Sequence, residues 1–143
     1  MVVHLVRYEH NEGASWGVLT GDLISPLRGE YPAPADLIEH GRSDWTAAAA
    51  QPGDVRAGDV ELLSPVTTPC RVMCQGANYR QHAIESGMDP DNRDFNLFFD
   101  KTDAAVTGPS APVTRPVHVT LLDYEIELAL VLRATVDAPT TVT

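Results

Sequence analysis

One segment, residues 121–132 (LLDYEIELALVL), constrains the fold more than any other part of this chain. Successive side chains of a β-strand point to opposite faces of the sheet. A strand here would place five apolar side chains on one face: Leu122, Tyr124, Ile126, Leu128 and Leu130. The other face would carry three acids and then two apolar residues: Asp123, Glu125, Glu127, Ala129 and Val131. The alternation predicts a strand within the longest strand-like stretch, residues 117–132.

The acidic face of this predicted strand suggests a cation site. Neighbouring carboxylates on one face lie about 6.5–7 Å apart. Covering them with another element is unfavourable without a cation, because like charges repel. Mg²⁺, Mn²⁺ and Ca²⁺ are hard ions that prefer oxygen ligands. The alternative is a solvated acidic face that needs no ligand, and the pattern taken alone favours that alternative.

A second segment, residues 76–87 (GANYRQHAIESG), carries a histidine and a glutamate three positions apart. Residues 79–86 are predicted to form a helix that Gly87 ends. On a helix His82 and Glu85 share a face and can form a hydrogen bond. A carboxylate fixes the tautomer of a neighbouring imidazole, which can then take a proton from water. The alternative is a surface contact worth less than about 1 kcal/mol.

The remaining elements are expected to be short. Residues 1–25 predict a three-stranded meander, with a turn at Asn11-Glu12-Gly13. Residues 36–41 predict a short helix ending at Gly41, and residues 42–60 a polar connection. Further along, the expected elements are a buried strand at 71–74, a polar loop at 88–94, an apolar segment at 95–99 and a turn at 108–112.

The charge, the apolar runs and the cysteine spacing exclude several kinds of partner and a disulfide. The formal charge is −10, which repels nucleic acid and anionic membranes. No apolar run approaches the roughly 20 residues of a membrane span, and the first ten residues lack a signal-peptide pattern. Cys70 and Cys74 would lie about 13 Å apart on a strand, too far for a disulfide. We therefore expect a cytoplasmic protein with free thiols that binds neither nucleic acid nor membrane.

Taken in order, three motifs resemble the fumarylacetoacetate hydrolase family. They are Gly76-x-Asn78-Tyr79-x-x-His82-x-x-Glu85, Phe98-Phe99-x-Lys101 followed by Gly108-Pro109, and Leu122-Asp-Tyr-Glu125-x-Glu127-Leu. The opening strands also resemble the small N-terminal β domain of that family. The resemblance implies a mainly β (α+β) fold. Residues 1–66 would form the N-terminal domain, and residues 67–143 the first half of a mixed β-roll with a short lid helix.

The same resemblance implies a site and a reaction. Glu125 and Glu127 would bind Mg²⁺ or Mn²⁺, with Ca²⁺ as a further candidate, and His82 with Glu85 would be the acid/base pair. Lys101 matches a family lysine to which we assign no role. The implied reaction is hydrolysis of a C–C bond in a small 2-oxo acid of the β-diketone or acylpyruvate type. Decarboxylation, isomerisation and hydration of such acids remain alternatives, and the implied assembly is a homodimer.

The sequence also departs from the family pattern. The third metal ligand, an aspartate in an N-D-x-S-x-R-D segment, and a later active-site lysine are both missing. We therefore expect a catalytic domain that is incomplete at its C-terminus. This leaves two alternatives to an enzyme: a fragment that self-associates or binds a partner through an open sheet edge, and a plain β domain with solvated acids.

Overall fold

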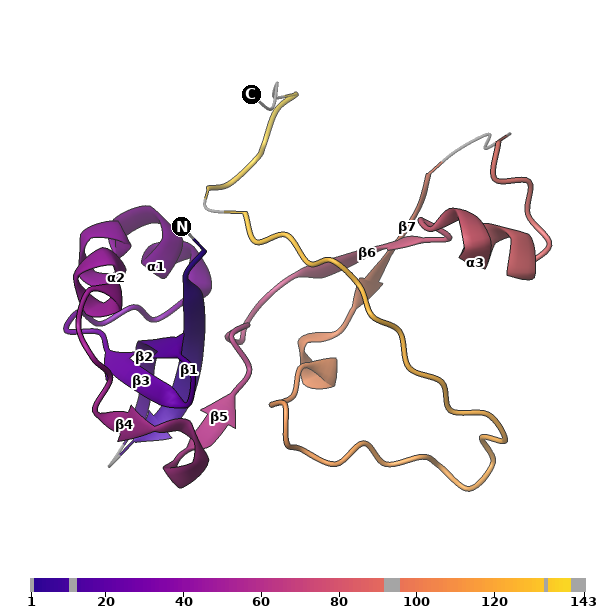
Figure 1. The fold of residues 1–143 in the computed structure, drawn as a ribbon. Coiled ribbons are helices and arrows are strands. Elements are labelled where there is room, and N and C mark those ends of the chain that lie inside the picture. The colour runs from indigo at the N-terminus through magenta and orange to yellow at the C-terminus, as the bar shows by residue number, and fades with distance from the viewer. Residues whose placement is uncertain (1, 11–12, 92–95, 133, 140–143) are drawn as a thin grey trace. The chain divides into compact units, whose positions relative to one another are not determined.

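The computed structural model describes residues 2–10, 13–91, 96–132 and 134–139 (Figure 1). The chain divides into two compact units. The first comprises residues 1–67 together with 107–143, and the second comprises residues 68–106.

An antiparallel sheet with the strand order β4-β3-β2-β1-β5 forms the centre of the first unit. Its strands are β1 (His4–His10), β2 (Gly13–Thr20), β3 (Leu23–Pro26), β4 (Val55–Arg56) and β5 (Glu61–Leu63). The predicted meander is confirmed by the pairing of β1 with β2 and of β2 with β3. Gly21 has a φ of 64° in the second turn, which favours glycine. The turn expected at 11–13 falls largely outside the described residues.

A short connection curls this sheet. Five strands laid flat would separate the two edge strands by about 19 Å, at about 4.8 Å per strand. The linker from β4 to β5 is the 3₁₀ turn η1 (Ala57–Asp59) and Val60, and a 3₁₀ turn rises only about 2 Å per residue. The edges must therefore curl toward each other. Tyr8 and Ile24 point to the same face of the sheet, and both are fully buried.

Two helices follow β3, α1 (Pro34–His40) and α2 (Arg42–Ala49), and they lie beside the sheet in Figure 1. The predicted short helix ending at Gly41 is confirmed. The prediction of a connection over residues 42–60 is wrong for its first half. The run Ala47–Ala50 favours helix, and burial of Ala48 adds to that preference.

The second unit contains a two-stranded antiparallel sheet and a helix. Strand β6 (Val72–Gly76) pairs with β7 (Leu97–Lys101), and α3 (Arg80–Glu85) lies between them in sequence. A strand at 71–74 and a helix at 79–86 are thus confirmed. The expected burial of that strand is wrong, because a two-stranded sheet leaves its faces largely uncovered: no residue of β6 is buried, and Met73 is 54% exposed. Gly87 ends α3 with a φ of 75°. A 3₁₀ turn, η2 (Asp103–Ala105), follows β7. Parts of the expected loop at 88–94 and apolar segment at 95–99 lie outside the described residues.

The strand predicted at residues 117–132 is not formed in the part of the chain that the structure describes. Both faces of residues 120–132 are exposed, with exposed fractions of 80% for Leu128 on one face and 47% for Val131 on the other. The physical reason is that a strand needs a neighbour for its backbone N–H and C=O groups, and no described strand pairs with this segment. The turn predicted at 108–112 is present, with the Ala111 N–H donating to the Gly108 carbonyl.

The fold class is therefore confirmed at the coarser level. The chain is mainly β, with few helices, and the β-roll stays a prediction. Within the described ranges, no helix combines the length and apolar character that crossing a membrane requires. Cys70 and Cys74 are free cysteines, as the spacing predicted.

Candidate active site

Helix α3 carries the predicted acid/base pair. His82 and Glu85 are both exposed, and Ala83 is the buried residue of the helix. The Glu85 carboxylate accepts a hydrogen bond from Nε2 of Gln81, at 3.0 Å. The Glu85 carboxylate was expected to orient the His82 imidazole. In the structure it contacts Gln81 instead of His82. The spacing of three still puts His82 and Glu85 on one helix face, so a rotation of the Glu85 side chain would join them.

Sequence reasoning missed an ion pair that joins the start of α3 to the chain beyond it. The Arg80 guanidinium donates two hydrogen bonds to the Asp91 carboxylate, at 2.5 and 2.7 Å. This hydrogen bonding holds the pKa of Asp91 below its ordinary value, and it raises that of Arg80. The only signal in the sequence was an arginine and an aspartate on either side of the glycine that ends the helix.

The predicted metal ligands lie elsewhere in the chain. Glu125 and Glu127 are exposed and belong to the segment that forms no strand. Among the described residues, no three His, Cys, Asp or Glu side chains come together as a metal site would require. Two carboxylates suit a hard divalent ion by chemistry, but Ca²⁺ or Mg²⁺ takes about six or more ligands. The described arrangement therefore does not assemble the metal site.

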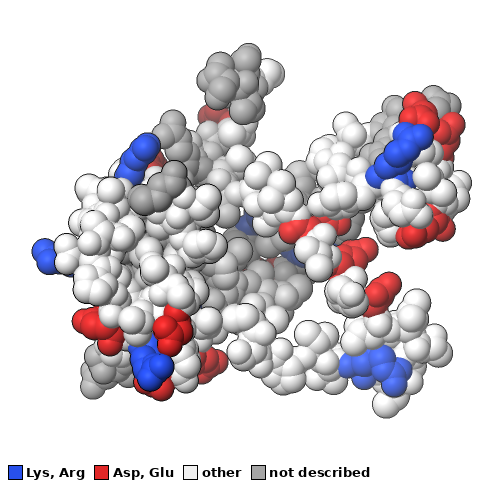
Figure 2. Space-filling model, in the orientation of Figure 1, with Lys and Arg blue, Asp and Glu red and all other residues white. Residues whose placement is uncertain are grey.

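Several basic side chains lie beside acidic ones on the face that Figure 2 shows. Two ion pairs of this kind join exposed side chains, Arg56 to Asp22 at 3.2 Å and Arg71 to Asp100 at 3.3 Å. Lys101 lies on β7, with its Nζ 5.4 Å from the centre of the Phe99 ring. This is a cation–π contact, and it assigns no chemical role to Lys101.

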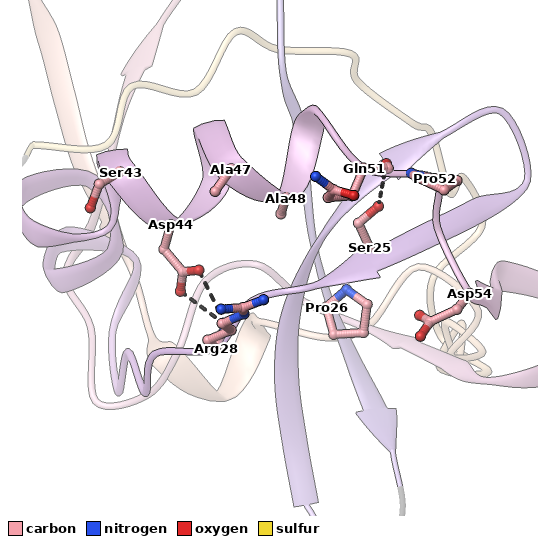
Figure 3. A pocket seen from close by; sticks show the side chains of 10 residues that line it. All are labelled: Ser25, Pro26, Arg28, Ser43, Asp44, Ala47, Ala48, Gln51, Pro52 and Asp54. Carbon is pink, nitrogen blue, oxygen red and sulfur yellow. Dashed lines mark hydrogen bonds between the residues drawn. The ribbon is translucent and has the colours of Figure 1, made fainter.

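The first unit contains a pocket of about 640 Å³ between α2, the end of β3 and the chain after α2 (Figure 3). Its lining comprises Ser25, Pro26, Arg28, Ser43, Asp44, Ala47, Ala48, Gln51, Pro52 and Asp54. The Asp44 carboxylate accepts hydrogen bonds from the backbone of Arg28 and Gly29, and Ser25 donates to the Gln51 carbonyl. These polar groups hold the fold together, and none of the four predicted site residues lines the pocket.

Comparison with known families separates two regions of the chain. Residues 71–142 match the family model described as "Fumarylacetoacetate (FAA) hydrolase C-terminal", which is half of the chain. Residues 3–65 match the model described as "Rv2993c-like, N-terminal". The first of these regions contains His82, Glu85, Glu125 and Glu127.

Several curated proteins are similar to this chain. "Protein Rv2993c" of Mycobacterium tuberculosis is 37% identical over 136 residues, covering 93% of this chain and 47% of that protein. "Oxaloacetate tautomerase YisK" of Bacillus subtilis is 41% identical over 76 residues, which cover 52% of this chain and 25% of the relative. Human "Oxaloacetate tautomerase FAHD2A, mitochondrial" is 34% identical over 100 residues, or 67% and 31% of the two chains.

The alignments thus span between about a quarter and about half of the length of these relatives. No solved structure matches the chain. The match over residues 71–142, together with these relatives, shows that the chain belongs to the fumarylacetoacetate hydrolase family.

Proposed function

We propose that this chain carries part of a metal-dependent active site that interconverts the keto and enol forms of oxaloacetate. The observation that carries the proposal is the family match over residues 71–142, which includes all four predicted site residues. The names of two similar proteins support the choice of oxaloacetate as the first substrate to test.

His82 is the proposed proton carrier. Tautomerisation removes a proton from the carbon next to the 2-oxo group and adds a proton to the carbonyl oxygen. Imidazole gains and loses a proton near neutral pH, so one side chain can serve as base and then as acid. Exposure of His82 on a six-residue helix leaves the ring accessible to a substrate. Glu85 would orient the imidazole when its carboxylate turns to it.

Glu125 and Glu127 are the proposed ligands of Mg²⁺ or Mn²⁺, with Ca²⁺ as the further candidate. When bound, such an ion supplies Lewis-acid polarisation of the 2-oxo carbonyl. The two side chains reach one face only if residues 121–132 adopt the extended pairing that their alternation favours. Two carboxylates leave coordination positions for water, for substrate oxygens and for other protein ligands.

A second candidate is hydrolysis of a C–C bond in an acylpyruvate or another β-diketone acid, and the description of the matched family favours it. There His82 would take a proton from the attacking water instead of from the substrate.

The proposed domains are those that the resemblance implied, residues 1–66 and 67–143. The two separate family matches support that boundary. The compact units also divide near residue 67, but residues 107–143 fall in the first unit.

Turnover tests the proton carrier. The keto–enol conversion of oxaloacetate is followed by its ultraviolet absorbance, with Mg²⁺ or Mn²⁺ present, beside an acylpyruvate cleavage assay. His82→Ala is expected to lower kcat at least about 10²-fold, the usual contribution of a general acid/base. His40→Ala is the control, because His40 is an exposed histidine of the first unit. Full turnover by the His82 variant would show that the proposed base is wrong.

Calorimetry with Mn²⁺ tests the metal site separately. Binding that Glu127→Gln abolishes and Glu61→Gln preserves would support the proposed ligands, since Glu61 is an exposed acid of β5. Absence of Mn²⁺ binding, combined with oligomers that grow with concentration, would favour the non-catalytic alternative, in which residues 121–132 only pair with another chain.

A further inference from the structure

The ion pair between Arg80 and Asp91 has a specific geometry. Arg80 is the first residue of α3, and Asp91 lies six residues beyond its end. Nη1 of Arg80 lies 2.5 Å from Oδ1 of Asp91, and Nη2 lies 2.7 Å from Oδ2. Two parallel, charge-assisted hydrogen bonds fix the orientation of both groups, which a single contact does not.

A series of backbone hydrogen bonds returns the chain to the start of α3. The Gly87 N–H donates to the Ile84 carbonyl at 3.0 Å, and the Met88 N–H donates to Ala83 at 2.9 Å. One Asp89 carboxylate oxygen then accepts the N–H of Asp91 at 2.9 Å, which forms a tight turn. The segment after α3 therefore folds back along the helix and presents the Asp91 carboxylate to Arg80.

Helix α3 depends on such anchors. A helix of six residues does not persist by itself in water, because too few hydrogen bonds offset the cost of its first turn. Ala83 is its buried residue, and alanine contributes little apolar surface. Arg80 and Asp91 are both largely exposed, so their contact adds little to global stability. The contribution of the pair is instead the orientation of a short, weakly packed helix.

We propose that Arg80 and Asp91 form a clamp that holds α3 against the following turn and so positions His82 for proton transfer. Both are positioning residues that act through the helix. The consequence for turnover rests on the proposed function of His82, whereas the consequence for the helix does not.

Hydrogen exchange of the α3 amides tests the clamp without any need for activity. The reporters are the N–H groups of Ala83, Ser86 and Gly87. Arg80→Gln and Asp91→Asn are each expected to speed their exchange by about two- to fivefold, the range for an exposed pair. The charge swap Arg80→Asp with Asp91→Arg restores slow exchange if the pair itself is responsible. Arg71→Gln is the matched control, since it removes an exposed contact to Asp100 on β7.

Three results would overturn the clamp. Unchanged exchange in both single variants would show that the pair does not hold α3. Faster exchange that the charge swap fails to reverse would assign the loss to the individual residues. Faster exchange in Arg71→Gln of the same size would assign it to the general stability of the unit.

Turnover supplies the second measurement. The single variants are expected to lower kcat and leave KM unchanged, and the charge swap to recover kcat. A raised KM in Arg80→Gln, with no change in Asp91→Asn, would place Arg80 on the substrate and overturn the positioning role. If the unaltered chain shows no turnover with any tested acid, the proposed function fails. The exchange measurements then still decide whether the clamp exists.

Discussion

The carboxylate of Asp44 in α2 accepts a hydrogen bond from the backbone N–H of Gly29, at 2.8 Å. The same carboxylate accepts the N–H of Arg28 at 3.0 Å and the hydroxyl of Tyr31 at 3.2 Å. One side chain of the second helix thus satisfies three donors in the segment that leads from β3 to α1. The hydrogen bond to Asp44 also contributes to a raised pKa of Tyr31, after the larger effect of burial.

We predict that Asp44→Ala lowers the free energy of unfolding by about 1–3 kcal/mol, because it leaves backbone donors without their acceptor. Urea denaturation followed by Trp16 and Trp45 fluorescence measures the change. The control is Asp22→Ala, which removes an exposed ion pair to Arg56 and is expected to cost about 0–1 kcal/mol. Equal effects of the two variants would contradict the structural role of Asp44.

A second prediction concerns Gly17 in the middle of β2. A Cβ atom placed there would overlap Cγ2 of Ile24 and lie 3.1 Å from the Ser25 carbonyl oxygen. Because both neighbours belong to the packed sheet, Gly17→Ala is expected to lower the free energy of unfolding by about 1–3 kcal/mol or more. Thermal unfolding measures it, and Gly58→Ala is the control, since nothing lies within 4 Å of a Cβ at that position. A stable Gly17→Ala variant would mean that the sheet is packed more loosely than described.

Local patterns predicted the elements of residues 1–41 well. The alternation in residues 1–25 fixed three strands, and glycines at 21 and 41 marked where elements end. These signals depend only on residues that are close together in the chain, so they can be read from the sequence alone. Residues 42–49 were misjudged because polar residues at the start of α2 conceal a helix, and Asp44 folds back onto the preceding loop.

The failure at residues 117–132 has a different cause. The alternation there predicts which side chains would share a face. It does not identify the neighbouring strand with which the segment would have to pair. The predicted metal site has the same dependence, since Glu125 and Glu127 converge only when that strand is paired. By contrast, His82 and Glu85 needed only a local helix, and the structure forms it. The helix that carries His82 and Glu85 was thus predictable from local sequence, whereas the acid/base role of the pair and the metal site both stay predictions.

Tyr8 provides a prediction about pH. Its side chain is fully buried, and its hydroxyl has no hydrogen-bond partner among the described residues. Burial raises the pKa of Tyr8 above the ordinary value of 10.0, and the negative charge of Asp54 raises it further. The folded chain therefore holds the Tyr8 proton more tightly than the unfolded chain does. This contribution to stability is complete below pH 10 and is lost as the pH rises through the folded-state pKa.

Urea denaturation between pH 8 and about pH 11 would measure that loss. The free energy of unfolding is expected to fall above pH 10 in the unaltered chain. The fall should be smaller in Tyr8→Phe, which also avoids burying a hydroxyl without a partner and so should keep or raise stability at pH 7. Identical slopes above pH 10 in the two proteins would show that the Tyr8 hydroxyl reaches solvent.

The last prediction concerns acid. The Arg80 guanidinium holds the pKa of Asp91 below its ordinary value of 3.8, chiefly through their hydrogen bonds. A carboxylate with a lowered folded-state pKa contributes fully above the unfolded value and loses its contribution as the pH falls through the folded one. The contact to Arg80 should therefore persist at neutral pH and break only below pH 3.8, where loosening of the turn after α3 would begin.

Nuclear magnetic resonance titration of the Asp91 carboxyl measures this directly. The midpoint is expected below 3.8 in the unaltered chain and to rise toward 3.8 in Arg80→Gln, because the variant removes the charge that favours the ionised form. In Arg71→Gln the midpoint should stay low, since Arg71 contacts Asp100 instead. A midpoint that Arg80→Gln leaves unchanged would mean that the two side chains do not remain paired in solution, and the orientation of α3 would then need another source.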